Sequence, residues 1–163
     1  MSEWTQVERR RLRAGIAVLA LTPALVGLWA TVAPRGFYDD FPGGGHSWVS
    51  AVGPYDEHLV RDVGALYLGS LVLLAFAYAW LDRRLVQAAL VSYAVAALPH
   101  LVYHLTALDG FDTGDAVAEI AGLALNVVLP LGLLAMTTKG GSERWRESRD
   151  RSAVGRSPAS PTG

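Results

Sequence analysis

The chain has 163 residues, of which 52% are hydrophobic and 18% are charged, and its formal net charge is −1. This balance, without an excess of basic residues, argues against nucleic acid as a partner. The sequence contains no cysteine, which excludes disulfides, thiolate metal ligands and thiol redox chemistry within it.

The hydrophobic residues are concentrated in four runs, each about as long as the roughly 20 residues that cross a bilayer. The runs are residues 14–33, 63–81, 85–108 and 116–138; the first three contain no Asp, Glu, Lys or Arg, and the last contains Glu119 alone. A soluble four-helix bundle would carry charges on its outer faces every three or four residues. The sequence therefore predicts an all-α polytopic membrane protein, a bundle of four transmembrane helices at about 14–33, 57–81, 85–108 and 115–138.

A short basic segment, residues 1–13, precedes the first of these helices. Its arginines and Trp4 suit the surface of an anionic leaflet, and a frayed end that only sets the topology is the simpler alternative. The apolar run that follows is longer than the roughly 7 to 15 residues of a signal peptide, so we expect it to remain as a helix.

The longest connection is the predicted outer loop, residues 34–56, where aromatic residues alternate with glycine and proline. Such a loop either folds over the mouth of the bundle or rests among the lipid headgroups. Its glycine triplet at 43–45 lacks the strand and helix context of a phosphate-binding loop.

The second predicted helix opens at Asp56, a residue suited to an N-cap, and Gly64, Gly69 and Ser70 offer small surfaces for close helix packing. Residues 82–84 form a tight turn before the third helix. Beyond the fourth helix, residues 139–163 are rich in Gly, Ser, Arg and Pro, which predicts a disordered cytoplasmic tail.

The charge distribution predicts the orientation of the chain. With the N-terminus inside, twelve of the 14 basic residues lie on the inner side, and nine of the 15 acidic residues lie on the outer side. The positive-inside rule then places both termini in the cytoplasm. We expect a multi-pass protein of the cytoplasmic (inner) membrane of a bacterium.

The predicted topology gathers most of the polar residues of the apolar segments in the outer half of the bundle. His100 and His104 are four residues apart and therefore share one helix face. The outer half also contains Glu119 and a charged group at the start of the second helix, which consists of Glu57, His58, Arg61 and Asp62. Because an intramembrane carboxylate is expensive to bury, Glu119 marks a candidate site.

This cluster allows three chemistries. A divalent transition metal could be held by His100, His104, Glu119 and His58, with Asp62 as an alternative to His58. A proton-transfer or quinone-type site would use the same histidines and Glu119 beside a lipophilic molecule. Haem ligation is the least favoured, because both histidines lie on one helix. The remaining candidates for ligand binding are Arg61, Asp62, Glu57 and Asn126.

Two longer strings carry a resemblance, namely residues 34–45 with residues 53–68, and the later segment Pro99-His100-Leu101-Val102-Tyr103-His104-Leu105. They resemble a group of uncharacterised actinobacterial four-helix membrane proteins, over roughly residues 14–138. The general layout is also similar to the DoxX-like set of small four-helix membrane proteins. The resemblance implies the fold and the membrane location, and it assigns no catalytic residues.

Two functional interpretations remain open from the sequence. An enzyme or redox protein would use the outer-half cluster on a lipophilic small molecule, with Arg61 holding an anionic group. A non-catalytic membrane component would pack against a partner subunit or a second copy of the chain, and its polar cluster would be structural. The positions of His100, His104, Glu119 and His58 relative to one another distinguish the two.

Overall fold

The protein is entirely helical over the residues described by its structure, a computed structural model that describes the backbone of residues 4–154 and the side chains of residues 4–138. The helices are α1 (Gln6–Val32), α2 (Pro34–Asp40), α3 (Trp48–Val52), α4 (Glu57–Trp80), α5 (Arg83–Leu105) and α6 (Thr113–Val154). Four segments, namely α1, α4, α5 and Thr113–Thr138 of α6, are long and apolar enough to cross a membrane. These segments indicate a multi-pass membrane protein, and they confirm the predicted number of spans.

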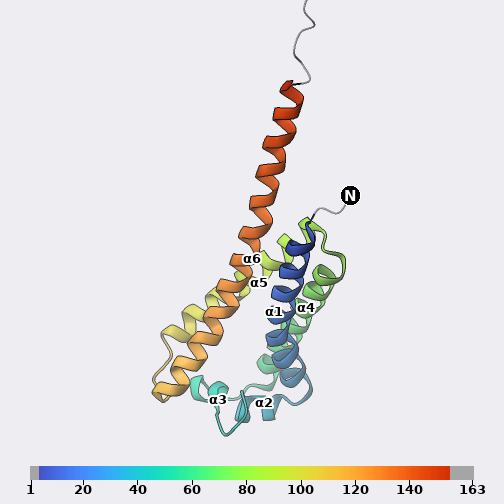
Figure 1. Cartoon of the computed structure of the whole chain (residues 1–163). Helices are drawn as coiled ribbons and strands as arrows, with labels where there is room; N and C mark the ends of the chain where they lie inside the picture. The colour runs from blue at the N-terminus through green and yellow to red at the C-terminus, as the bar shows by residue number, and fades with distance from the viewer. Residues whose placement is uncertain (1–3, 155–163) are drawn as a thin grey trace, which may run out of the picture.

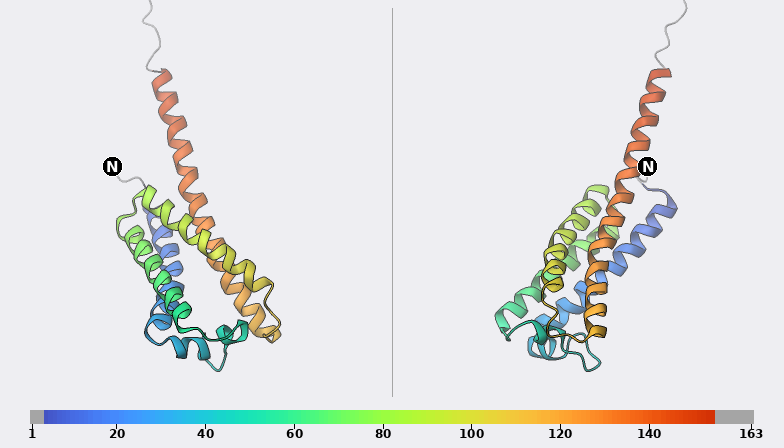
Figure 2. Two further views of the ribbon diagram at one scale, coloured as in Figure 1. Left: turned by 180° about the vertical axis from the view of Figure 1, so that it is seen from behind. Right: turned by 90° about the vertical axis from the view of Figure 1, so that its left-hand side faces the viewer.

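The four long helices form two antiparallel pairs, α1 with α4 and α5 with α6 (Figure 1). The pairs lie close together where the chain begins and diverge toward the other end, where α2 and α3 are found (Figure 2). We call these the terminal end and the loop end. The start of α1 and the far end of α6 both lie at the terminal end, as an even number of crossings requires (Figure 1).

A hydrophobic core at the terminal end joins all four long helices. It includes Leu12 and Ile16 from α1, Leu74 from α4, Leu90 from α5 and Leu133 from α6. Close packing of these side chains accounts for the contact between the two pairs at this end.

Trp4 is also part of this core, and its indole Nε1 donates a hydrogen bond of 2.6 Å to the carbonyl of Leu81. The Arg83 guanidinium lies 4.7 Å from the Trp4 ring. The sequence predicted that residues 1–13 either rest on a leaflet or fray. Instead α1 begins at Gln6, and Trp4 holds the start of the chain on the turn between α4 and α5.

A second, smaller core lies at the loop end and belongs to α1, α4 and the connection between them. Val26 and Ala30 of α1 pack with Phe37 of α2, and Trp29 and Phe41 cover them. The predicted outer loop is therefore partly helical, and its aromatic residues pack on the α1/α4 pair. Gly43, Gly44 and Gly45 all have positive φ, a conformation that suits glycine, and they form the turn between α2 and α3.

Acidic and hydroxyl side chains cap the helices at their N-termini. Asp56 accepts a hydrogen bond from the Leu59 amide, which confirms it as the N-cap of α4, and Asp82 does the same for α5. Thr5 and Glu8 form a capping box at the start of α1.

The last helix extends well past its predicted end. The sequence predicted a disordered tail from residue 139, but α6 continues as helix to Val154. A helix of 42 residues is about 63 Å long, roughly twice the thickness of a bilayer core. The rest of the predicted tail, residues 155–163, lies outside the described residues.

Candidate functional site

A crevice of about 220 Å³ lies between the two helix pairs, on the loop-end side of the larger core, and all four long helices line it. Its wall is mainly apolar. The lining residues are Thr22 from α1, Val63, Leu66, Tyr67 and Ser70 from α4, Tyr93, Ala96, Ala97 and His100 from α5, and Leu123 and Asn126 from α6. The crevice exists because the pairs are packed together at one end and diverge at the other.

Polar groups of α5 and α6 meet on one wall of the crevice. The Tyr93 hydroxyl donates a hydrogen bond of 2.6 Å to Asn126 Oδ1, and the Asn126 amide donates one of 2.8 Å to the Gly122 carbonyl. Both residues line the crevice. His100 also lines it, one helical turn after Ala96 on α5. An apolar cavity with a few polar groups is the usual form of a small-molecule site.

The two histidines of α5 are neighbours, as their spacing predicted. Their ring centroids are 4.6 Å apart and the rings meet edge to face. His100 is exposed at the crevice, whereas His104 is 7% exposed. One imidazole is therefore available to a bound molecule and the other is enclosed by protein.

His104 faces Glu119, which is 5% exposed on the neighbouring helix. His104 Nδ1 lies 2.8 Å from Glu119 Oε1, within ion-pair distance, although the orientation does not make a hydrogen bond. Glu119 Oε2 is also buried without a hydrogen-bond partner. Buried polar atoms are nearly always satisfied in native proteins, so an unsatisfied carboxylate oxygen at this position is a functional signal.

A further ion pair links the α2–α3 connection to the start of α6. His46 Nδ1 lies 2.7 Å from the Asp115 carboxylate. Asp115 lies in the first turn of α6, where a negative charge is favoured, and it precedes Glu119 by one helical turn. The His46 side chain is about half exposed.

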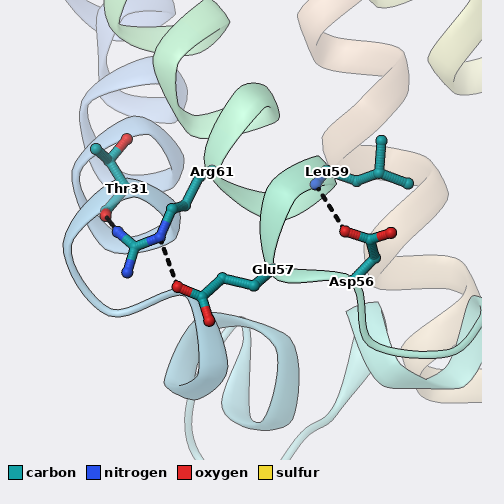
Figure 3. Close-up of polar contacts among 5 residues, drawn as sticks. All are labelled: Thr31, Asp56, Glu57, Leu59 and Arg61. Atoms are coloured by element: carbon teal, nitrogen blue, oxygen red, sulfur yellow. Dashed lines mark hydrogen bonds and ion pairs between the residues drawn. The ribbon is translucent and has the colours of Figure 1, made fainter.

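The charged group at the start of α4 lies apart from the crevice. Arg61 Nε bonds to Glu57 at 2.9 Å, and its Nη1 donates to the Thr31 carbonyl in the last turn of α1 (Figure 3). His58 is 82% exposed and pairs with Asp62 at 3.3 Å. Arg61 thus connects the start of α4 to the last turn of α1 at the loop end of this pair, whereas the His58–Asp62 contact lies within α4.

The predicted metal set is therefore not assembled. His100, His104 and Glu119 come together, but His58 belongs to the other helix pair, and the pairs diverge at this end of the bundle (Figure 2). Among residues 4–138, whose side chains the structure describes, no three His, Asp or Glu residues are arranged to hold a metal ion.

Arg35 forms the other charged contact of the loop end. It lies 2.6 Å from Asp39, and this carboxylate raises the pKa of the Arg35 guanidinium through their hydrogen bond and charge attraction. The guanidinium also covers the rings of Tyr38 and Tyr55. This cluster ties α2 to the segment that leads into α4, away from the crevice.

Of the predicted site residues, His100 and Asn126 line the crevice, and His104 and Glu119 lie next to His100. Tyr93 and the pairing of His46 with Asp115 were not predicted from the sequence. Tyr93 is the one tyrosine in the apolar segment 88–98, and a phenolic hydroxyl within such a segment indicates a residue that needs a hydrogen-bond partner. The pairing of His46 depends on the path of the α2–α3 connection, for which the sequence offers no periodicity.

No protein-family model, curated protein or solved structure matches this chain. The crevice and its polar groups therefore provide the evidence on function.

Proposed function

We propose that this protein binds a lipophilic molecule with a hydroxyl-bearing ring in the crevice and exchanges a proton with it at His100. The observation that carries the proposal is the crevice itself, whose apolar wall holds the Tyr93–Asn126 pair and the exposed imidazole of His100. An imidazole is well suited to accept or return a proton near neutral pH.

The size and position of the crevice support a ring-sized head group. A volume of about 220 Å³ is below the roughly 300 to 1,000 Å³ of pockets that enclose a whole drug-sized molecule. Leu66 and Ala96, on its rim, are exposed. A ring would therefore occupy the crevice while an attached hydrocarbon tail stayed in the bilayer.

The proposed setting is the cytoplasmic membrane of a bacterium, with both termini inside and the loop end outside. The excess of basic residues in the segments of the terminal end supports this orientation. We also propose that the chain is related to the uncharacterised actinobacterial four-helix membrane proteins that its sequence resembles, which have a DoxX-like layout.

Binding of 2-naphthol, a fluorescent bicyclic phenol, to the protein in nanodiscs tests the proposal. We expect saturable binding to the wild type and at least a tenfold weaker affinity in Ala97→Phe, about 1.4 kcal/mol, because the added ring fills the crevice. Val95→Phe is the matched control, because Val95 lies on the same helix with its side chain exposed. Equal affinity in the two variants would show that the probe binds elsewhere, and no saturable binding to the wild type would overturn the proposal.

A second candidate function is that of a non-catalytic membrane subunit whose polar residues only join helices. One observation favours it: both the Tyr93–Asn126 and the His104–Glu119 contact connect α5 to α6. In that case Tyr93→Phe and Glu119→Gln would lower thermal stability, and the crevice would bind no phenol.

A further inference from the structure

We propose that five titratable side chains form a proton path from the crevice to the surface of the loop end, in the order His100, His104, Glu119, Asp115 and His46. The path rests on the proposed function, because its inner end is the imidazole that would meet the bound molecule. It adds a route: protons would be exchanged between the crevice and water at the loop end.

The side chains of the inner part of the path are close neighbours. His100 opens to the crevice, and its ring centroid is 4.6 Å from that of His104. His104 Nδ1 is in turn 2.8 Å from Glu119 Oε1. An imidazole can accept a proton on one ring nitrogen and release another from the second, so each ring can relay a proton without turning.

The middle of the path is enclosed. The side chains of His104 and Glu119 are 9% and 6% exposed, and Glu119 Oε2 has no hydrogen-bond partner. A purely structural pair would be expected to satisfy both carboxylate oxygens. An unsatisfied oxygen instead leaves one position on Glu119 free to accept or release a proton.

The outer part of the path leads to a half-exposed imidazole. Asp115 precedes Glu119 by one turn of α6, a spacing of about 5 to 6 Å between Cβ atoms, which one water molecule can bridge. Asp115 is 2.7 Å from His46 Nδ1, and the His46 side chain is 48% exposed. The groups facing Glu119 are thus His104 from α5 and Asp115 on its own helix, while His46 faces Asp115 from the α2–α3 connection.

The proposed reaction is proton transfer alone, with no change of oxidation state. The O–H bond of the bound phenol breaks and an N–H bond forms at His100, leaving a phenolate in the crevice. Successive proton transfers along the five side chains then return each of them to its starting state and release one proton to water at the loop end. The reverse sequence protonates the phenolate.

The test uses 2-naphthol bound to the full chain in nanodiscs, because the phenol and phenolate forms differ in fluorescence. After a rapid rise in the pH of the solution, we expect the bound probe in Glu119→Gln to deprotonate about 100-fold more slowly than in the wild type, with unchanged affinity. His46→Gln should also slow the reaction, and added imidazole should restore the rate in this variant but not in Glu119→Gln.

His58→Gln is the matched control, because His58 is also a loop-end imidazole paired with an aspartate but lies off the path. A rate in Glu119→Gln equal to that of the wild type and His58→Gln, with the probe still bound, would overturn the path and leave the proposed function standing. Absence of binding to the wild type would overturn both. Asp115→Asn provides a second interruption of the path if Glu119→Gln does not fold, and an unchanged rate in that variant would likewise overturn it.

Discussion

The two helix pairs are held together by different means. The α1/α4 pair relies on close backbone contact: a Cβ added at Gly64 would lie 2.8 Å from the Thr31 amide nitrogen, and one at Gly27 would lie 3.1 Å from the Leu68 nitrogen. The α5/α6 pair is instead joined by polar side chains, with Tyr93 against Asn126 near the middle of the helices and His104 against Glu119 nearer the loop end.

This difference indicates that the α1/α4 pair is mainly structural and that the α5/α6 pair carries the candidate functional residues. Small residues such as Gly27 and Gly64 let the two helices approach closely, which suits a rigid support. Titratable side chains between α5 and α6 add little stability in a membrane, on the order of 0.6 kcal/mol per hydrogen bond, so their presence calls for a functional explanation.

The largest expected effect comes from the α1/α4 contact. Gly64→Ala should lower the free energy of unfolding by about 3 kcal/mol, because the new methyl group meets the backbone of Thr31 and the helices must separate. Thermal unfolding in detergent measures the change.

Gly69→Ala controls for the intrinsic helix propensity of alanine, because a Cβ at Gly69 meets nothing within 4 Å. We expect this variant to be neutral or up to about 1 kcal/mol more stable. If both alanine variants behaved alike, close backbone approach would not be what holds the pair.

A smaller effect is expected at the loop end of the same pair. Arg61→Gln removes the donor that serves the Thr31 carbonyl and the partner of Glu57, and should cost about 1 kcal/mol. Equilibrium unfolding in a mixed detergent with denaturant measures it. Asp62→Asn, which breaks only the exposed contact with His58, should leave the stability unchanged.

The smallest expected effect on stability lies in the α5/α6 pair. Tyr93→Phe removes the hydroxyl that bonds to Asn126 and should lower the stability by about 0.6 kcal/mol. The same change should weaken 2-naphthol binding, since the polar wall of the crevice is altered. Tyr78→Phe, at an exposed position on α4, should change neither quantity. A loss of stability above 2 kcal/mol would place α5/α6 among the scaffold contacts and remove the contrast between the pairs.

The sequence was sufficient to predict the four long helices, but not α2 and α3 in the predicted outer loop or the arrangement of the helices. Uninterrupted apolar runs and the cap at Asp56 locate α4 and α5 within a few residues, because bilayer thickness sets the length of a spanning segment. Which helices pair, and where the pairs diverge, depends on side-chain packing across the bundle, and hydrophobic periodicity in one helix carries no information on it. The tail was assigned by composition, which missed the helical continuation to Val154.

The candidate site was predictable in part for the same reason. His100 and His104 lie on one helix, so their spacing alone made them neighbours, and predicted depth brought Glu119 to the same level. The predicted depth in the membrane also suggested that His58 would lie next to these three residues. The divergence of the pairs keeps it away, and that divergence is a property of the whole bundle.

The contact between Trp4 and Leu81 has a consequence for biosynthesis. The acceptor carbonyl follows the indole by 77 residues in the sequence and lies at the end of α4, so it is synthesised only after both long helices of the first pair. The first helix can therefore reach its final position only after the second long helix has crossed the membrane and returned the chain to the same side. The Trp4 contact thus forms only once both helices of the first pair are in place.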